Sequence, residues 1–314
     1  MGRVLGRDEI YGIIPHRYEN VLLDRIELSE KENNERSGAG EVSFRRDDGE
    51  GRGIFIVKDP EGNDIYYPFM FMEFFALGAI TLMEEKIRQG LVAVFSSIRK
   101  VVFSGGADAG TPLASHVTLK GETSGFHRFA GTVQNNGDTL VDLQIMAYGV
   151  DFSAQGMPAD SEAKKTELPS FNEETGVECS LFGYKRPELV CADSIRFFSA
   201  EEKALVTEYT YPDTHPFTKG HFPDNPVMMG IMQIMAASDA GELLAARLDV
   251  ENSNFVTDSI LAREDGTVVC EVKKLDLQIR SQGVFPGICA VKTVAFRDMI
   301  RPGEKLYCRT SCTG

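Results

Sequence analysis

The stretch that decides the fold reads Gly220-His221-Phe222-Pro223-Asp224-Asn225-Pro226-Val227-Met228-Met229-Gly230 and runs straight into an apolar segment. From Gly230 to about Leu248, apolar residues occupy nearly every face of a helix, so we expect this helix to be buried on all sides. An antiparallel sheet wrapped around the helix is the simplest cover for it. The sequence therefore predicts a loop with one histidine that leads into a buried central helix.

Similar features occur earlier in the chain, around a second apolar helix expected from about Phe69 to Arg88. Each helix is preceded by a strand of alternating polar and apolar residues, Gly38 to Phe44 in one case and Leu205 to Tyr211 in the other. The strand-and-turn pairs that follow the helices are Val101 to Phe103 with Gly110 to Leu113, and Val294 to Arg297 with Arg301 to Leu306. Because the order of features is the same, we expect two copies of one unit.

Both copies open on a short basic motif followed by an apolar strand that contains an aspartate. The motifs are Pro15-His16-Arg17-Tyr18 and Tyr184-Lys185-Arg186-Pro187. The strands are expected at Val21 to Ile26 and at Leu189 to Ile195, with Asp24 and Asp193 inside them. These openings extend the repeat toward the start of each copy.

The predicted fold class is α+β, with two antiparallel sheets that each wrap a long central helix. Residues 1–153 form the first repeat and residues 177–314 the second, and the two are expected to pair as a covalent pseudo-dimer. Residues 154–176 are expected to form a surface linker, because the segment from Ala154 to Thr175 is rich in Ser, Pro, Glu, Lys and Gly and has no apolar periodicity.

The two copies differ at their ends. After Leu113 the first copy continues with two expected strands, His127 to Gln134 and Thr139 to Tyr148, around an Asn-Gly turn. Only residues 307–314 follow Leu306 in the second copy. The second repeat is therefore predicted to be two strands short, and the chain to be a fragment or one region of a longer polypeptide.

Composition and motifs exclude several classes of function. The net charge is −14, and no run of Lys and Arg is available for binding phosphates, so nucleic acid is a poor partner. No uninterrupted apolar stretch of about 18 residues could span a bilayer, and the first residues do not resemble a targeting signal. Because of those first residues, a cytoplasmic location is expected. Six cysteines lack metal-ligand spacing and are expected to be reduced. Neither a metal nor a nucleotide cofactor is indicated.

The stretch from Gly220 to Gly230 resembles the active-site segment of FabZ-type and FabA-type 3-hydroxyacyl-acyl carrier protein dehydratases. Their pattern is Gly-His-Phe-Pro, two residues, Pro, two residues, Pro-Gly, and then a helix with an acidic residue fourteen places after the histidine. The segments Pro15 to Arg25 and Val294 to Leu306 also look like parts of this family. The resemblance implies a hot-dog fold, here a tandem double hot-dog.

The departures from the family pattern are complementary. Met235 stands fourteen places after His221, so the second copy lacks the acid, and Met229 replaces a proline. In the first copy the helix carries Glu73 at the acidic position, but Asp59 stands where the histidine would be. Each copy therefore keeps the half of the site that the other has lost.

Family dimers take the histidine from one subunit and the carboxylate from the other, so the resemblance implies one composite site with His221 and Glu73. Asp59 and Met235 are then expected to face each other in an inactive one. The family's glycine five places before the acid, whose N–H binds the thioester carbonyl, corresponds to Gly230 in the second copy. In the first copy the same place holds Pro68, which has no N–H to donate.

The implied reaction converts a 3-hydroxyacyl thioester on acyl carrier protein to the trans-2-enoyl thioester, in fatty-acid or polyketide-type synthesis. His221 suits the general base, because an imidazole titrates near neutral pH. Glu73 suits the acid, since apolar neighbours disfavour its charged form. Weak candidates for contacting an acidic carrier protein are Arg99, Lys100, Lys273, Lys274 and Arg280.

Other interpretations remain open. A hot-dog thioesterase would use an acidic residue without a paired histidine, and a non-catalytic acyl-binding or scaffold domain would explain the lost acid at Met235. For Glu73, the alternative is an ion pair with an arginine such as Arg17 or Arg25. The remaining histidines, His16, His116, His127 and His215, are interpreted as structural or surface residues.

Overall fold

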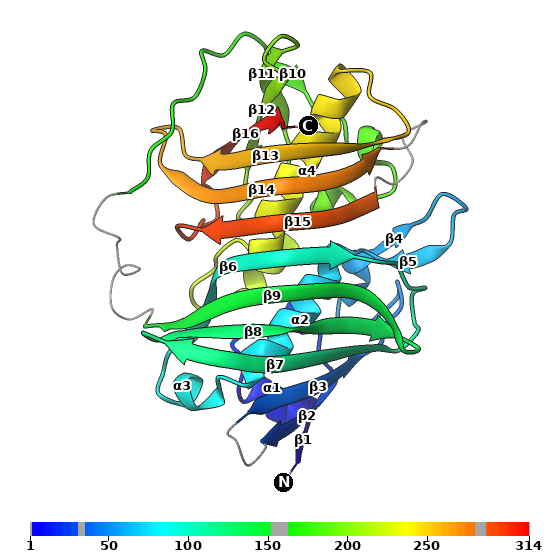
Figure 1. Cartoon of the computed structure of the whole chain (residues 1–314), viewed down its shortest axis with the longest axis vertical. Coiled ribbons are helices and arrows are strands. Elements are labelled where there is room, and N and C mark those ends of the chain that lie inside the picture. Colours follow the sequence, from blue (N-terminus) through cyan, green and yellow to red (C-terminus); the bar gives the residue numbers. More distant parts are fainter. Residues whose placement is uncertain (1, 31–34, 152–162, 280–286, 314) are drawn as a thin grey trace. The chain divides into compact units, whose positions relative to one another are not determined.

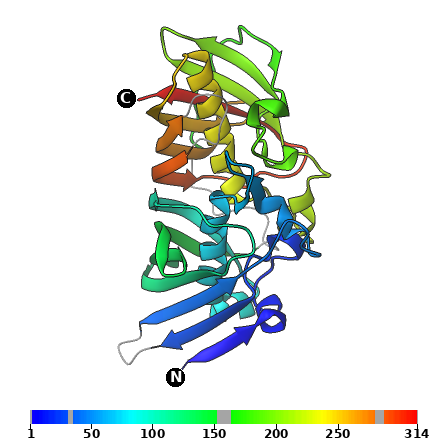
Figure 2. The same cartoon turned by 90° about the vertical axis from the view of Figure 1, so that its right-hand side faces the viewer.

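The computed structural model describes residues 2–30, 35–151, 163–279 and 287–313, and the chain divides into two compact units (Figures 1 and 2). Unit 1 comprises Met1–Ile56, Asp64–Met157 and Lys219–Pro226, and unit 2 comprises Val57–Asn63, Pro158–Thr218 and Val227–Gly314. The loop with His221 thus belongs to unit 1, although its sequence lies in the second repeat.

Unit 1 contains an antiparallel sheet with the strand order β1-β2-β3-β7-β8-β9-β6. The strands are β1 (Arg3–Gly6), β2 (Arg25–Glu30), β3 (Arg36–Val42), β6 (Val92–Phe103), β7 (Leu113–Thr123), β8 (Phe126–Asn135) and β9 (Asp138–Val150). Two further short elements of this unit are α1 (Arg7–Tyr11) and β5 (Asp64–Tyr66), while β4 (Ile56–Lys58) has its last two residues in unit 2. The turn from β8 to β9 holds Asn136 and Gly137 at positive φ, as a tight hairpin requires.

The central helix of unit 1 is α2 (Phe69–Thr81), which packs against β3, β7, β8 and β9. All its residues are buried, as the apolar sequence predicts. The helix ends earlier than expected: Thr81 Oγ1 donates to Gly78 O (2.7 Å), and the chain turns into a separate helix, α3 (Glu84–Arg88). No residue of α3 is buried, and its charged side chains reach the surface. A continuation of α2 in the same direction would have buried these charges.

Unit 2 contains a second antiparallel sheet with the strand order β10-β11-β12-β16-β13-β14-β15. The strands are β10 (Thr175–Gly176), β11 (Ser194–Ser199), β12 (Ala204–Thr210), β13 (Ser253–Ala262), β14 (Val268–Ile279), β15 (Gly287–Phe296) and β16 (Lys305–Cys312). Its central helix is α4 (Gly230–Arg247), which packs on β12, β13, β14 and β16. A sheet wrapped around a buried helix occurs in both units, so the double hot-dog fold is confirmed.

The second sheet is not two strands short, and that expectation was wrong for the described residues. β16 pairs with β12 as β7 pairs with β3. The places of β8 and β9 are filled by β13 and β14, which come before β15 in the chain instead of after β16. The reason is that a strand needs a hydrogen-bonded neighbour, but not one from a particular place in the sequence.

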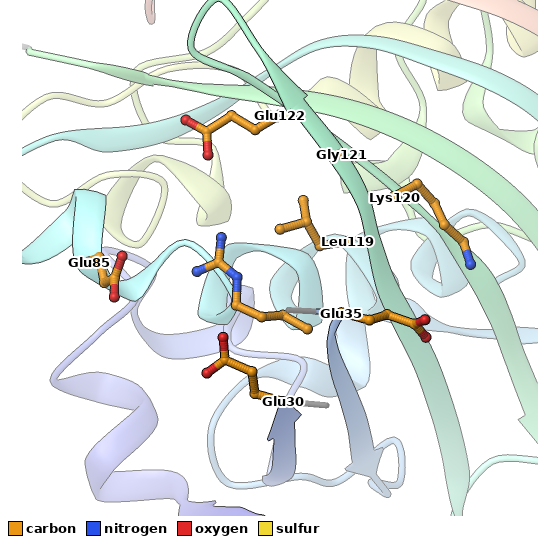
Figure 3. A pocket seen from close by; sticks show the side chains of 8 residues that line it. Glu30, Glu35, Glu85, Leu119, Lys120, Gly121 and Glu122 are labelled. Atoms are coloured by element: carbon orange, nitrogen blue, oxygen red, sulfur yellow. The ribbon is translucent and has the colours of Figure 1, made fainter. Parts of the chain in front are cut away.

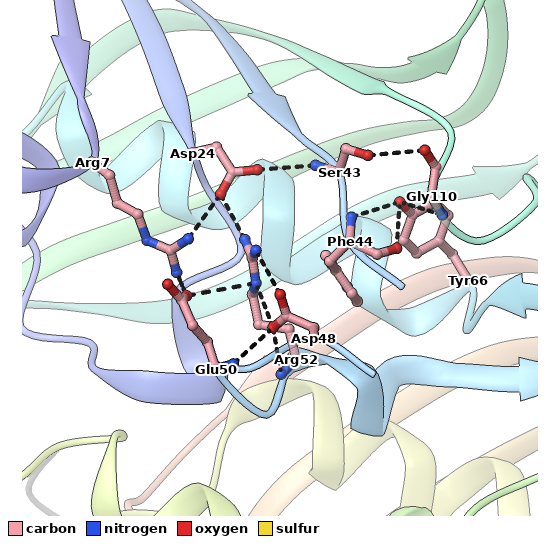
Figure 4. Close-up of polar contacts among 9 residues, drawn as sticks. All are labelled: Arg7, Asp24, Ser43, Phe44, Asp48, Glu50, Arg52, Tyr66 and Gly110. Carbon is pink, nitrogen blue, oxygen red and sulfur yellow. Dashed lines mark hydrogen bonds and ion pairs between the residues drawn. The ribbon is translucent and has the colours of Figure 1, made fainter. Parts of the chain in front are cut away.

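The two aspartates expected inside the opening strands lie just before them instead. Asp24 Oδ2 accepts from Ser43 N (3.0 Å) and Asp193 Oδ2 accepts from Thr210 N (2.7 Å), so each carboxylate ties the start of one strand to the end of the next. Asp24 also binds Arg52 (2.6 Å), a residue that is 5% exposed (Figure 4). These contacts explain the repeated aspartate as structural.

The expected linker, residues 154–176, lies partly outside the described residues. Its described part is attached to unit 2, because Thr166 N donates to Gly266 O (2.9 Å) and Lys164 pairs with Glu271 (2.5 Å).

Candidate active site

Glu73 lies on α2, deep in unit 1. Its side chain is 5% exposed, and burial raises the pKa of this carboxyl to about 7. Oε1 has no hydrogen-bond partner among the described residues. Glu73 is therefore a buried acid that keeps its proton in a large fraction of molecules at neutral pH.

The loop that carries His221 is fastened to the opening segment of unit 1. Gly220 O accepts a hydrogen bond from Arg17 N (3.0 Å). A Cβ on Gly220 would lie 2.1 Å from Arg17 O and 2.2 Å from Asn20 Nδ2, so only glycine permits this approach. The close backbone contact explains why glycine precedes the histidine.

The side chain of His16 contacts both predicted catalytic residues. Its ring centroid is 5.1 Å from that of His221, with the planes at 60°, and its Nε2 is 3.7 Å from Glu73 Oε1. The centroid of the Phe222 ring lies 5.0 Å from that of His16, and the two rings are nearly perpendicular, at 82°. His16 thus brings His221 and Glu73, which come from different repeats, into one cluster within unit 1.

His16 was interpreted as a structural or surface residue, and the sequence did not predict its contacts with His221 and Glu73. His16 is 1% exposed, and burial lowers its pKa well below the usual value, with the nearby His221 and Arg17 acting in the same direction. The one signal in the sequence was its place in the repeated opening motif. That signal carries no information on which helix the side chain reaches.

Arg17 and Arg25, the alternative partners of Glu73, bind other groups. Arg17 Nη1 donates to Ile14 O (2.7 Å) and His16 O (2.6 Å), while Arg25 binds Glu41 (3.0 Å). The remaining histidines lie outside the cluster. His116 is exposed on β7, His127 lies on β8 beside Glu122, and His215 binds Glu188 O in unit 2.

Unit 2 has a different polar cluster beside its helix. Met235 is fully buried on α4, and the carboxylates of this helix are Asp239, one turn further on, and Glu242. Asp239 forms an ion pair with Lys185, and both side chains are fully buried. Asp59, expected opposite Met235, accepts hydrogen bonds from Asn63 in the turn between β4 and β5.

Gly230 is the first residue of α4, and a Cβ there would lie 3.0 Å from the Phe296 ring. The first N–H groups of a helix have no partner within it and carry the positive end of the helix dipole. The corresponding place in unit 1 is Pro68, directly before α2. A backbone donor is therefore available at the start of α4 and absent at Pro68.

A surface pocket of about 660 Å³ lies elsewhere in unit 1 (Figure 3). It is lined by Glu30, Glu35, Arg36, Glu85, Leu119, Lys120, Gly121 and Glu122. Its α3 residue, Glu85, comes after the C-terminal end of α2, whereas Glu73 lies near the start of that helix. The pocket is open and strongly charged, so it does not resemble the apolar channel that an acyl chain would occupy.

The basic residues considered for partner binding are spread over both units. Lys100 pairs with Asp142 (3.6 Å) and Lys273 with Asp258 (3.1 Å), while Arg99 and Lys274 are exposed. Arg280 lies outside the described residues. Within the described ranges no group of three His, Cys, Asp or Glu could hold a metal ion, and no helix is long and apolar enough to cross a membrane.

No family model matches the chain. Among curated proteins it is similar to the 3-hydroxyacyl-(acyl-carrier-protein) dehydratase FabZ of Xylella fastidiosa strain M23, with 26% identity over 142 residues, or 40% of this chain and 86% of that protein. The same enzyme of strain M12 is 25% identical over the same length.

Solved structures with similar folds include polyketide-type dehydratases. The dehydratase domain of a mycocerosic acid synthase-like polyketide synthase has a TM-score of 0.48 and 12% identity, covering 92% of this chain and 96% of that one. The bifunctional dehydratase-cyclase domain in ambruticin biosynthesis has a TM-score of 0.44 and 12% identity, covering 99% of each chain.

The chain is thus a double hot-dog protein that is similar in sequence, over 40% of its length, to FabZ dehydratases.

Proposed function

We propose that this chain removes water from a 3-hydroxyacyl thioester carried on acyl carrier protein and releases the trans-2-enoyl thioester, in fatty-acid or polyketide-type synthesis. One observation carries the proposal: His221 and Glu73 both contact His16 within unit 1, although they come from different repeats. Dehydration needs a base and an acid on one small substrate, and this cluster supplies both.

In the proposed reaction, neutral His221 takes a proton from the carbon next to the thioester carbonyl. The electron pair moves toward the carbonyl oxygen and then forms the C2–C3 double bond as the C3–O bond breaks. Glu73 gives its proton to the departing hydroxyl, which leaves as water. Because the pKa of Glu73 is about 7, the carboxyl retains a proton to donate at neutral pH.

Gly230 is proposed as the donor to the thioester carbonyl. Its N–H lies in the first turn of α4, where a developing negative charge on oxygen is stabilised by the helix dipole. The resemblance to FabZ supports this role, and Pro68 at the matching place of unit 1 cannot perform it.

The carrier protein as partner is supported by the name of the FabZ relatives. The buried apolar residues next to Glu73 in the sequence, Met72, Phe74 and Phe75, suit a site for an acyl substrate. A cytoplasmic location is proposed because all six cysteines are free thiols, as is usual in a reducing compartment.

The test is turnover of 3-hydroxyacyl-carrier protein, followed by mass spectrometry of the acyl product. We expect His221→Ala and Glu73→Gln each to lower kcat by about 10² to 10⁴, because each removes one proton-transfer group. His116→Ala, on an exposed histidine of unit 1, is the control and should retain full activity.

Unchanged rates in both site variants would overturn the assignment of the site. Release of free thiol instead of an enoyl product would identify a thioesterase. Acyl binding by the wild-type chain without any turnover would identify a binding or scaffold domain.

A further inference from the structure

His16 is a third titratable side chain in the cluster, and the proposed reaction leaves it without a role. It is buried between three partners: the His221 ring, the Phe222 ring and the carboxyl of Glu73. A side chain that contacts both the base and the acid is well placed to control their relative orientation.

The segment that carries His16 is itself rigidly held. The Arg17 guanidinium donates to the carbonyls of Ile14 and His16, so it closes the turn on which His16 stands. The backbone N–H of the same arginine donates to Gly220 O, in the loop of the base. One short segment therefore fixes both the His16 ring and the residue before His221.

The charges around His16 favour a neutral ring. Burial, the proximity of His221 and the Arg17 guanidinium all lower its pKa, and the carboxyl that its Nε2 faces, that of Glu73, has a raised pKa. A neutral imidazole has one N–H donor and one acceptor nitrogen. Nε2 faces Glu73, whereas Nδ1 has no hydrogen-bond partner among the described residues.

Unit 2 provides an independent indication that the second residue of the opening motif contacts the central helix. Lys185 takes the place of His16 in the repeated opening motif, and its ammonium group pairs with Asp239 on α4. In both units the second residue of the motif therefore contacts a carboxyl group on the helix of its own unit. In unit 1 that carboxyl is the proposed acid.

We propose that His16 is a positioning residue for the dehydration: its Nε2 orients the carboxyl of Glu73 toward the substrate, and its ring edge fixes the plane of His221. This inference rests on the proposed function. It assigns to His16 no bond-making step, because the protons move between the substrate, His221 and Glu73.

The test compares three substitutions of His16. A leucine fills the space without a polar atom, an asparagine places its amide near the position of Nδ1, and a glutamine places its amide nitrogen near that of Nε2. We expect His16→Leu and His16→Asn to lower kcat at least tenfold with KM changed less than about threefold, because the substrate is still bound but the acid is misdirected. His16→Gln should recover activity to within about threefold of wild type.

The pH profile separates positioning from packing. The titratable groups that face Glu73 are His16 and, through it, His221, with Arg17 on the same segment as His16. Without a polar neighbour the neutral form of Glu73 is further favoured, so the high-pH limb of kcat/KM in His16→Leu should move upward by about half a pH unit. A purely structural change would lower activity without moving this limb.

Two results would overturn the inference. One is a leucine variant with wild-type kcat and pH profile, and the other is a glutamine variant no better than leucine. If the leucine variant does not fold by circular dichroism, the asparagine variant decides in its place. Failure of the proposed function is distinguishable, because His221→Ala and Glu73→Gln would then retain activity as well.

Discussion

His16 and Lys185 occupy the same place in the repeated motif, and each reaches a carboxyl group on the central helix of its own unit. In unit 1 the pair is His16 with Glu73 at 3.7 Å, and desolvation disfavours the charged form of both groups. In unit 2 the pair is Lys185 with Asp239, a fully buried ion pair. The same position therefore holds an imidazole beside a carboxyl group in one unit and an amino group beside a carboxyl group in the other.

The two pairs also differ in how well their polar atoms are satisfied. Asp239 accepts a second hydrogen bond from Cys191 N (2.7 Å), and the neighbouring Glu242 accepts from Tyr184 and Ser238. In unit 1, by contrast, Glu73 Oε1 and His16 Nδ1 have no hydrogen-bond partner among the described residues. Satisfied buried polar groups stabilise a fold, whereas unsatisfied groups remain available to a substrate.

The largest expected effect on stability comes from removing the Lys185–Asp239 pair of unit 2. Lys185→Met removes the ammonium group and leaves Asp239 and Glu242 buried, so we expect the free energy of unfolding to fall by about 3 to 5 kcal/mol. Urea unfolding measures the change. Lys292→Met, on an exposed lysine of the same unit, should change it by less than about 0.5 kcal/mol. Equal effects in the two variants would contradict a structural role for the ion pair.

In unit 1, the free energy of unfolding should depend on pH through the carboxyl of Glu73, the partner of His16. Its folded pKa of about 7 lies above the ordinary value of 4.5, so the native state binds more protons than the unfolded state between these values. This stabilising contribution is complete below about pH 4.5 and is lost as the pH rises through about 7. Between pH 5 and pH 8 the loss amounts to roughly 2 to 3 kcal/mol.

Glu73→Gln should remove this dependence, because glutamine does not titrate. We expect its free energy of unfolding, relative to wild type, to rise by that amount from pH 5 to pH 8 in urea titrations. Exposed Glu201→Gln controls for the loss of one negative charge. Parallel pH curves for wild type and Glu73→Gln would show that burial does not hold the proton on this carboxyl.

The smallest of the three effects is expected where the loop that carries His221 contacts the opening segment of unit 1, at Arg17. Gly220→Ala places a Cβ against Arg17 O, so the loop must shift, with an expected cost of about 1 to 3 kcal/mol and a lower kcat. Gly49→Ala, in the same unit, adds a Cβ with no atom within 4 Å and is the control. An alanine at Gly220 without effect on unfolding or turnover would argue against this attachment.

The amino-acid sequence predicted two repeats with buried helices, and its resemblance to FabZ-type dehydratases implied the complementary losses on which the proposed pairing of His221 with Glu73 rests. These features are visible because helical periodicity and short motifs are local properties of the chain. The raised pKa of Glu73 was likewise predictable from its apolar neighbours Met72, Phe74 and Phe75.

Only the tertiary structure decided the role of His16, the structural use of Asp24 and Asp193, and the order of strands in unit 2. Each depends on which distant segments meet: His16 on α2, the aspartates on the ends of β3 and β12, and β13 on β16. An alternating pattern indicates a strand but not its neighbour, because the backbone hydrogen bonds that join strands are the same for every sequence.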